Sequence, residues 1–266
     1  MPFHAKEFTV SIHGSQCDCI QFGKGPKTMI MLQGLNTRGI KGASLSLALM
    51  YRIFAKEYTV YLFDRRENLP KDLTVRELAA DVAAVMDQLG LSKADILGVS
   101  QGGMIAQYLA MDRSDLVNKM VLAVTLSRKN PTVEAVLEHW ISMTEQGAWS
   151  DLVEDMAVKM YSSAYVRRYR PFMKLLTLLQ IPKDVPRFLT LTRACLTCDT
   201  YEQLDRIHCP VLVIGGGQDL LVTGEASVEM AEKLGCQIYM YEDLGHAAYE
   251  EAKDFNQRVL KFFKAS

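Results

Sequence analysis

The 266-residue sequence predicts an α/β protein with a mostly parallel, eight-stranded sheet flanked by helices. Eight apolar, β-branched runs have the length of strands, and helical patterns separate most of them. The alternation stops between Arg128 and Asp205, where only helical patterns occur. A Gly-x-Ser-x-Gly segment lies at one strand-to-helix junction. These observations predict an all-helical insert after the sixth strand and reactive chemistry at that junction.

The strands are expected in an order that makes most of the sheet parallel. Gly14-Ser15 separates the first two runs closely enough for a hairpin, whereas helical patterns separate most of the later ones. The expected strands are 7–13, 16–22, 27–33, 58–63, 93–99, 118–124, 210–214 and 237–241.

The clearest helical pattern covers residues 75–89. Apolar residues recur there at 75, 78, 79, 82, 85, 86 and 89, which is the spacing of one helix face. Thr74 is a suitable N-cap and Gly90 a suitable C-cap. A second helical pattern follows His246 and is expected over 247–264.

The insert divides the chain into three segments. We expect residues 1–127 and 206–266 to form the α/β core and residues 128–205 to form the helical cap, with prolines marking helix starts or bends. The expected helices are 131–146, 149–161, 164–180 and 186–198. Such a cap would close an apolar pocket over Ser100, for which the candidate lining residues are Met143, Met156, Met160 and Phe172. The alternative is a helical bundle remote from that site.

Composition argues against several classes of partner. Thirty basic and thirty-one acidic residues give a net charge of −1, which offers no attraction for nucleic acid or an anionic membrane. No run is long enough to cross a bilayer, and residues 1–7 lack the apolar centre of a secretory signal, so a cytoplasmic protein is expected. The six cysteines are expected to be reduced packing residues, and Cys195-x-x-Cys198 lacks the context of a redox or zinc motif.

The segment Gly98-Val99-Ser100-Gln101-Gly102 is a nucleophile-elbow motif. It follows the apolar run 94–97 and precedes the helical run 104–110. We expect a tight turn in which Ser100 has a strained backbone and the glycines leave room for neighbouring chain. The Ser100 hydroxyl would then stand clear of the sheet.

A serine needs a base and an orienting acid to become a nucleophile. Of the five histidines, His246 lies on the loop after a strand, at the edge where open α/β sheets place working residues. Asp219 likewise follows the strand-like run 210–214. The loop after 118–124 contains no acid before Arg128, which leaves Asp219 as the candidate.

These motifs, in the order Ser, Asp, His, resemble the α/β-hydrolase superfamily. Within it the chain is similar to the capped, cofactor-independent esterases, lactonases and dehalogenase-like enzymes, over nearly its whole length. Ser100 argues against dehalogenases and epoxide hydrolases, which place aspartate there. The resemblance implies an oxyanion hole made by the backbone N–H groups of Gln101 and Leu35.

The chain departs from this pattern at two places. Gln33 stands where relatives usually have histidine before Gly34-Leu35. Asp64-Arg65-Arg66 resembles a D-x-R motif but lacks the usual glycine-rich continuation. We interpret it as a salt-bridged turn, the alternative being that Arg65 or Arg66 receives a substrate carboxylate.

The expected activity is hydrolysis of a small, mainly apolar ester, lactone or thioester through Ser100, His246 and Asp219 and an acyl-enzyme. The expected partner is a small acyl substrate, without nucleic acid, membrane, metal or cofactor. Two alternatives stay open: C–C bond hydrolysis of a ring-cleavage product, and a ligand receptor with little turnover. The oligomeric state and the substrate are not determined by the sequence.

Overall fold

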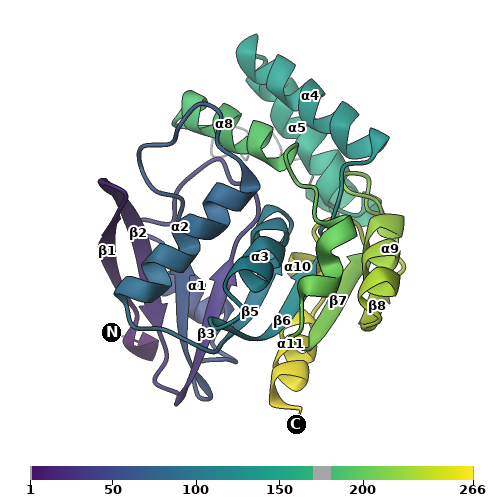
Figure 1. Ribbon diagram of the computed structural model, residues 1–266. Helices are drawn as coiled ribbons and strands as arrows, with labels where there is room; N and C mark the ends of the chain where they lie inside the picture. The colour runs from purple at the N-terminus through teal and green to yellow at the C-terminus, as the bar shows by residue number, and fades with distance from the viewer. Residues whose placement is uncertain (1, 170–180, 266) are drawn as a thin grey trace.

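The computed structural model describes residues 2–169 and 181–265, whose centre is one eight-stranded sheet (Figure 1). The strand order is β1-β2-β4-β3-β5-β6-β7-β8. Pairing is antiparallel between β1 and β2 and between β2 and β4, and parallel from β4 through β8. This confirms the expected mostly parallel sheet. The strands are β1 Lys6–Ile12, β2 Ser15–Phe22, β3 Lys27–Leu32, β4 Tyr58–Phe63, β5 Ala94–Val99, β6 Val117–Ala123, β7 Val211–Gly216 and β8 Gln237–Tyr241.

The predicted hairpin joins β1 to β2. Ile12 pairs with Ser15, and the two residues between them, His13 and Gly14, have φ values of 50° and 71°. A two-residue loop with positive φ at both positions suits the twist of antiparallel strands.

Helices cover both faces of the sheet. Alternate residues of β3 show the division, because Ile30 packs with the α2 and α3 side while Met31 packs with the α1 and α11 side. The first layer consists of α2 (Val75–Gln88), α3 (Gln101–Asp112) and α9 (Gly224–Leu234), and the second of α1 (Ser44–Met50), α10 (Ala248–Glu251) and α11 (Phe255–Lys264).

Helix α2 has the N-cap that its sequence predicts, whereas its C-cap lies one residue before the predicted Gly90. The Thr74 hydroxyl accepts from the Glu77 N–H, and the Glu77 carboxylate accepts from the Thr74 N–H, which forms a capping box. At the other end Leu89 is the C-cap and Gly90, with φ 63°, is the next residue.

The helical insert lies between β6 and β7, as predicted. It contains α4 (Pro131–Glu145), α5 (Trp149–Met160), α6 (Ser163–Tyr169), α8 (Val185–Cys195) and the 3₁₀ helix η3 (Tyr201–Arg206). Figure 1 shows α4, α5 and α8 gathered at one end of the sheet. The part of the predicted helix 164–180 after residue 169 lies outside the described residues.

Most predicted ends of the described elements lie within one residue of the observed ends, and three elements differ more. Helix α8 stops at Cys195 rather than 198, where the Thr197 hydroxyl binds the Ala194 carbonyl and residues 196–198 form turns. Strand β7 extends to Gly216, because Gly215 pairs with Met240 and Gly216 with Tyr241 of β8. A Cβ on Gly215 would lie 2.6 Å from Met240 Sδ. The stretch 247–264 forms two helices, α10 and α11, with a break between them. Phe255, the first residue of α11, is buried in the core on that side of the sheet.

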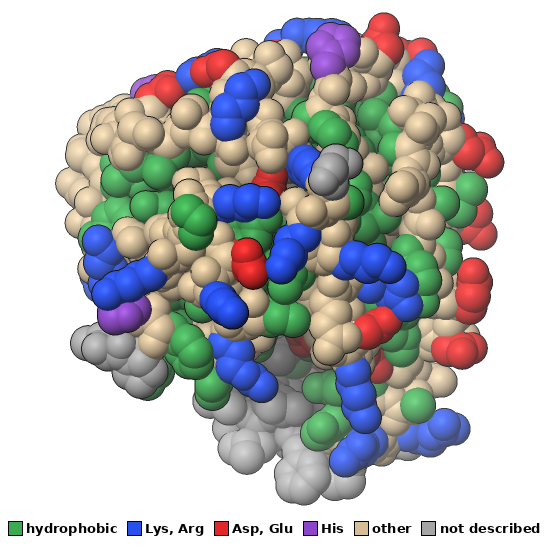
Figure 2. Space-filling model, turned by 90° about the horizontal axis from the view of Figure 1, so that it is seen from below, with side chains coloured by type: hydrophobic (Ala, Val, Ile, Leu, Met, Phe, Trp, Pro, Cys, Tyr) green, Lys and Arg blue, Asp and Glu red, His purple; other side chains and the backbone are tan. Residues whose placement is uncertain are grey.

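Charged side chains are distributed unevenly over the face opposite the insert. Viewed from the end opposite the insert, Lys and Arg side chains gather across the centre of the face and Asp and Glu along one edge (Figure 2). All six cysteines are unpaired thiols, as expected. Among the described helices, none is both long and apolar enough to cross a membrane.

Candidate active site

Ser100 occupies a strained turn between β5 and α3. Its φ of 52° and ψ of −119° are unusual for a residue with a side chain and cost about 1–3 kcal/mol. Two hydrogen bonds hold this conformation: the Ser100 N–H donates to the Ala123 carbonyl at 2.9 Å, and the Thr125 hydroxyl donates to the Ser100 carbonyl at 2.7 Å. The turn therefore depends on the end of β6 as well as on its own sequence.

The glycines around Ser100 are required by close backbone contacts, as predicted. A Cβ on Gly98 would lie 2.6 Å from the Gly102 carbonyl oxygen. A Cβ on Gly102 would lie 1.9 Å from the Leu32 carbonyl oxygen. Gly103, which the sequence analysis did not single out, would place a Cβ 2.6 Å from the Thr125 side chain.

His246 lies between Ser100 and Asp219 in one hydrogen-bonded row. Its Nε2 is 2.9 Å from Ser100 Oγ, and its Nδ1 is 2.8 Å from Asp219 Oδ2. The other Asp219 oxygen accepts the N–H groups of Leu221 and Val222 at 2.8 and 3.0 Å. This fixes the carboxylate, so the Nδ1–H tautomer of His246 can donate to it while Nε2 accepts from the serine hydroxyl.

Two loops bring the imidazole to this place. Gly216 at the end of β7 lets the His246 loop approach, because a Cβ there would lie 2.2 Å from the Gly245 carbonyl oxygen. The N–H after the histidine, that of Ala247, donates to the Met160 carbonyl at the end of α5. His246 and Asp219 are 2% and 5% exposed, so their hydrogen bonds are sheltered from competing water.

Leu35 and Gln101, whose N–H groups were expected to form an oxyanion hole, belong to two segments close to Ser100. A Cβ on Gly34 would lie 3.2 Å from the Ser100 Cβ, which shows how closely the loop after β3 approaches. Within the described residues, the N–H groups of Leu35 and Gln101 have no backbone acceptor. The Gln101 N–H also stands at the positive end of α3.

The Asp64-Arg65-Arg66 segment forms the salt-bridged turn expected from the sequence. Arg66 pairs with Asp81 at 2.8 Å, and Asp64 pairs with Arg187 of α8 at 3.3 Å. Arg65 donates to the Gln33 carbonyl and to the Gln101 side chain. Neither Arg65 nor Arg66 lines the pocket at Ser100, so the structure does not favour the alternative of a carboxylate-binding arginine.

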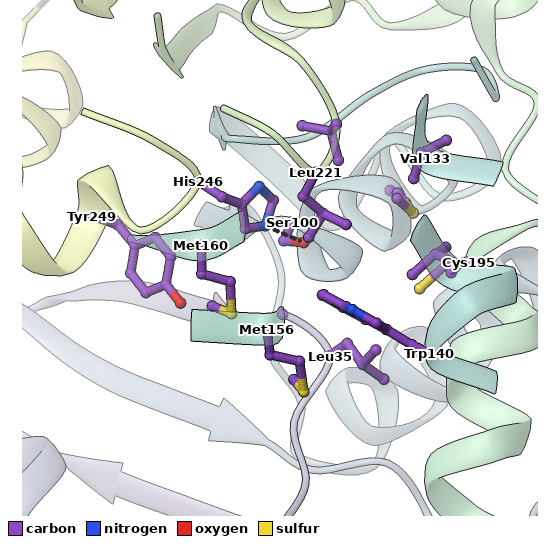
Figure 3. A pocket seen from close by; sticks show the side chains of 14 residues that line it. Leu35, Ser100, Val133, Trp140, Met156, Met160, Cys195, Leu221, His246 and Tyr249 are labelled. Atoms are coloured by element: carbon purple, nitrogen blue, oxygen red, sulfur yellow. Dashed lines mark hydrogen bonds between the residues drawn. The ribbon is translucent and has the colours of Figure 1, made fainter. Parts of the chain in front are cut away.

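A narrow pocket opens onto Ser100 and His246 between the sheet and the insert (Figure 3). Its free volume of about 30 Å³ has room for only one or two water molecules. Apart from Ser100 and His246 its walls are almost entirely apolar. They are formed by Gly34, Leu35, Met104, Val133, Leu137, Trp140, Met156, Met160, Cys195, Leu221, Val222 and Tyr249.

The pocket confirms some predicted lining residues and corrects others. Met156 and Met160 line it, whereas Met143 packs into the core, and Phe172 lies outside the described residues. The α4 residues Val133, Leu137 and Trp140 also line it and were not predicted. Their spacing of four and three positions places them on one helix face and could have indicated them.

The described residues contain no cluster of three or more His, Cys, Asp or Glu side chains able to hold a metal ion.

The chain matches a known protein family. Residues 42–258 match the model of the alpha/beta hydrolase family. The chain belongs to the alpha/beta hydrolase family. The resemblance inferred from its sequence is thereby confirmed, and the chain is a hydrolase.

Individual relatives are distant but align along the chain. A Rhizobium rhizogenes protein named "Putative carbamate hydrolase RutD" is 26% identical over 252 residues, which cover 90% of this chain and 93% of the relative. An Acinetobacter baylyi protein named 3-oxoadipate enol-lactonase 2 is 24% identical, with 98% of each chain covered. The crystal structure of MGS-M2, an alpha/beta hydrolase from a Medee basin deep-sea metagenome library, has a TM-score of 0.88 at 19% identity, covering 97% of this chain and 98% of its own.

Proposed function

We propose that this hydrolase cleaves a small, mainly apolar ester, lactone or thioester through a Ser100–His246–Asp219 triad and an acyl-enzyme. The observation that carries the proposal is the unbroken row of hydrogen bonds from Ser100 Oγ through the imidazole to the Asp219 carboxylate. This is the arrangement in which a base takes the proton of a serine and an acid stabilises the base once charged.

The proposed reaction has two halves. Ser100 Oγ attacks the substrate carbonyl carbon while its proton moves to His246 Nε2. The tetrahedral intermediate then breaks its bond to the leaving group, which takes the proton, and the acyl group stays on Ser100. His246 next removes a proton from water as the water oxygen adds to the acyl carbonyl carbon. The bond from that carbon to Ser100 Oγ then breaks, Oγ takes the proton back from His246, and the acid leaves.

The proposed oxyanion hole consists of the Leu35 and Gln101 N–H groups. Both are without a backbone acceptor among the described residues, and both belong to segments close to Ser100: Gln101 follows it directly, and a Cβ on Gly34 would lie 3.2 Å from the Ser100 Cβ. In a water-poor pocket a single such donor contributes about 2.7–4 kcal/mol to transition-state stabilisation.

The substrate class follows from the pocket walls. No Lys, Arg, Asp or Glu belongs to the pocket lining of the described chain, which favours an uncharged acyl group. We also propose that residues 128–205 act as a cap domain between core segments 1–127 and 206–266. Residues of α4, α5 and α8 supply much of the wall facing Ser100, which supports this division.

The names of the relatives support acyl transfer to water without selecting one acyl group. One name refers to a carbamate and the other to an enol-lactone. Both substrates contain a carbonyl carbon bonded to a leaving group, which is the feature that the proposed mechanism attacks.

Hydrolysis of nitrophenyl esters from acetate to decanoate tests the proposal. Ser100→Ala should lower kcat/KM by at least about a thousandfold, because the acyl acceptor is lost. The matched control is Ser227→Ala, which removes a buried hydroxyl from α9 outside the pocket and should leave activity unchanged.

Covalent trapping gives a second readout. A fluorophosphonate should add its phosphonyl group to Ser100 of the wild type, seen by mass spectrometry of the peptide, and should not label Ser100→Ala. Equal ester hydrolysis by wild type and Ser100→Ala would reject the serine mechanism. A folded wild type that neither hydrolyses these esters nor reacts with fluorophosphonate would point to a receptor.

A further inference from the structure

The molecule contains a buried arginine that the proposed reaction does not use. Arg65 follows β4 and is 6% exposed. No carboxylate lies within salt-bridge distance of its guanidinium in the described part of the chain, although Asp64 is its neighbour. Its Nε is buried without a hydrogen-bond partner. A buried charge without an ion-pair partner is costly, so this side chain requires an explanation.

Asp64 is engaged elsewhere and does not pair with the guanidinium. One of its oxygens accepts the Ile40 N–H at 3.0 Å, and the other accepts the Arg65 N–H at 2.7 Å and lies 3.3 Å from Arg187. Burial consequently lowers the pKa of Arg65 from its usual value, a loss that the more distant charge of Asp64 partly opposes. The guanidinium is therefore a cation held mainly by neutral groups.

Those neutral groups belong to the two segments beside Ser100. Arg65 Nη2 donates to the Gln33 carbonyl oxygen at 2.7 Å and to Gln101 Oε1 at 2.9 Å. Gln33 lies two residues before Leu35, and Gln101 directly follows Ser100. One nitrogen atom thus joins the loop after β3 to the first residue of α3.

The Gln101 side chain also reaches the insert. Its Nε2 donates to the Leu191 carbonyl at 2.8 Å and lies 3.1 Å from Cys195 Sγ, both on α8. Since its Oε1 and Nε2 are both engaged, the side-chain amide is held between Arg65 and α8 and cannot rotate freely.

We propose that Arg65 is a positioning residue that sets the spacing of the two oxyanion-hole N–H groups and adds a buried positive charge behind them. This inference rests on the proposed function and deepens it. Because the site is water-poor, a fixed cation and fixed dipoles favour the charged intermediate more than the neutral substrate. The effect should therefore appear in kcat and leave KM nearly unchanged.

Arg65→Met tests the proposal, since it keeps the side-chain length and removes the charge and both hydrogen bonds. We expect kcat to fall about 10- to 100-fold and KM to change less than about twofold. Binding of a trifluoromethyl ketone, which adds to Ser100 Oγ and forms an oxyanion, should weaken by the same factor as kcat. Arg65→Lys, which keeps the charge and a donor, should retain more activity than Arg65→Met.

The matched control is Arg66→Met, the same change at the next residue. Arg66 pairs with Asp81 and donates to the Asn68 carbonyl, so it is tied into the same turn without touching Gln33 or Gln101. Its kcat and ketone affinity should match the wild type. An equal loss in both variants, or wild-type kcat and ketone affinity in folded Arg65→Met, would overturn the proposal.

A second variant covers the case in which Arg65→Met does not fold. Gln101→Met removes the amide that Arg65 binds but keeps the backbone N–H, and it should show the same loss of kcat and ketone affinity. Unchanged values in that folded variant would also overturn the proposal. A different result would contradict the proposed function itself: ester hydrolysis that continues in Ser100→Ala.

Discussion

At the scale of single residues, the site depends on positions where no side chain fits. Ser100 tolerates its positive φ only because Gly98 and Gly102 let the turn pack against neighbouring backbone. The strain of one residue is thus offset by contacts of residues before and after it.

Gly102→Ala should therefore destabilise the protein by at least about 3 kcal/mol, because its Cβ would lie 1.9 Å from the Leu32 carbonyl oxygen. The control is Gly90→Ala, where nothing lies within 4 Å and only the φ of 63° is unfavourable, at a cost of about 1 kcal/mol. Urea unfolding measures both variants. Similar losses would show that the close contact does not determine the glycine.

Cys195 gives a second prediction at this scale. It lines the pocket, yet burial raises the pKa of its thiol to about 11, although the Gln101 hydrogen bond acts in the opposite direction. At pH 8 only about one molecule in a thousand would carry the reactive thiolate. Iodoacetamide should leave Cys195 unmodified in native protein and alkylate it in urea, as followed by mass spectrometry. Rapid native alkylation would contradict the burial argument.

At the scale of elements, α8 is bound directly to the loop after β4. Arg187 donates to the carbonyl oxygens of Arg65 and Arg66, each at 2.6 Å, and also contacts Asp64. Two of these three contacts go to main-chain carbonyl groups of the core, so they do not depend on which side chains the loop carries.

Arg187→Ala should loosen α8 from the core. Backbone amides of residues 188–195 should exchange at least about tenfold faster with solvent, corresponding to about 1.4 kcal/mol of local stability, while α2 amides stay protected. Arg193→Ala removes an exposed arginine of the same helix that pairs with Glu145, and it should change exchange little. Equal exchange in the two variants would argue against the contact with the β4 loop.

The sequence predicted the elements well where local signals mark their ends. Thr74 and Gly90 flank α2, and Gly-rich or loop residues follow the strands that lead to Ser100, Asp219 and His246. Spacing shows which residues of a helix share a face, as it does for Val133, Leu137 and Trp140, but it does not show which part of the helix lies over Ser100. For this reason Met143 was wrongly expected in the pocket and Trp140 was missed, although both lie on α4. The contacts of Arg65 join the loop after β4 to the loop after β3 and to the first residue of α3, and they could not be predicted from spacing.

At the scale of the whole molecule, the insert and the core leave a narrow space beside Ser100. The free volume there is about 30 Å³, and the long flexible side chains of Met156 and Met160 form part of its wall. Which substrates can enter is therefore expected to depend on these two side chains.

Met156→Ala should enlarge the pocket and move the preferred nitrophenyl ester toward longer acyl chains. A shift of about three methylene groups is expected, because the substitution removes the side-chain atoms Cγ, Sδ and Cε and each buried methylene of the acyl chain contributes about 0.8 kcal/mol. Val158→Ala is the control, because Val158 is 46% exposed on the same helix and outside the pocket. An unchanged chain-length profile in Met156→Ala would place the acyl group elsewhere.

Trp140 provides a fluorescence signal at the pocket. The sequence has only two tryptophans, and Trp140 is 1% exposed, with its indole N–H donating to Asp155 at 2.7 Å and its ring against the space at Ser100. In Trp149→Phe it becomes the sole indole emitter. Its fluorescence then reports the polarity beside the serine directly, so that the arrival, turnover and departure of a colourless ligand can be timed by stopped flow without a chromogenic leaving group.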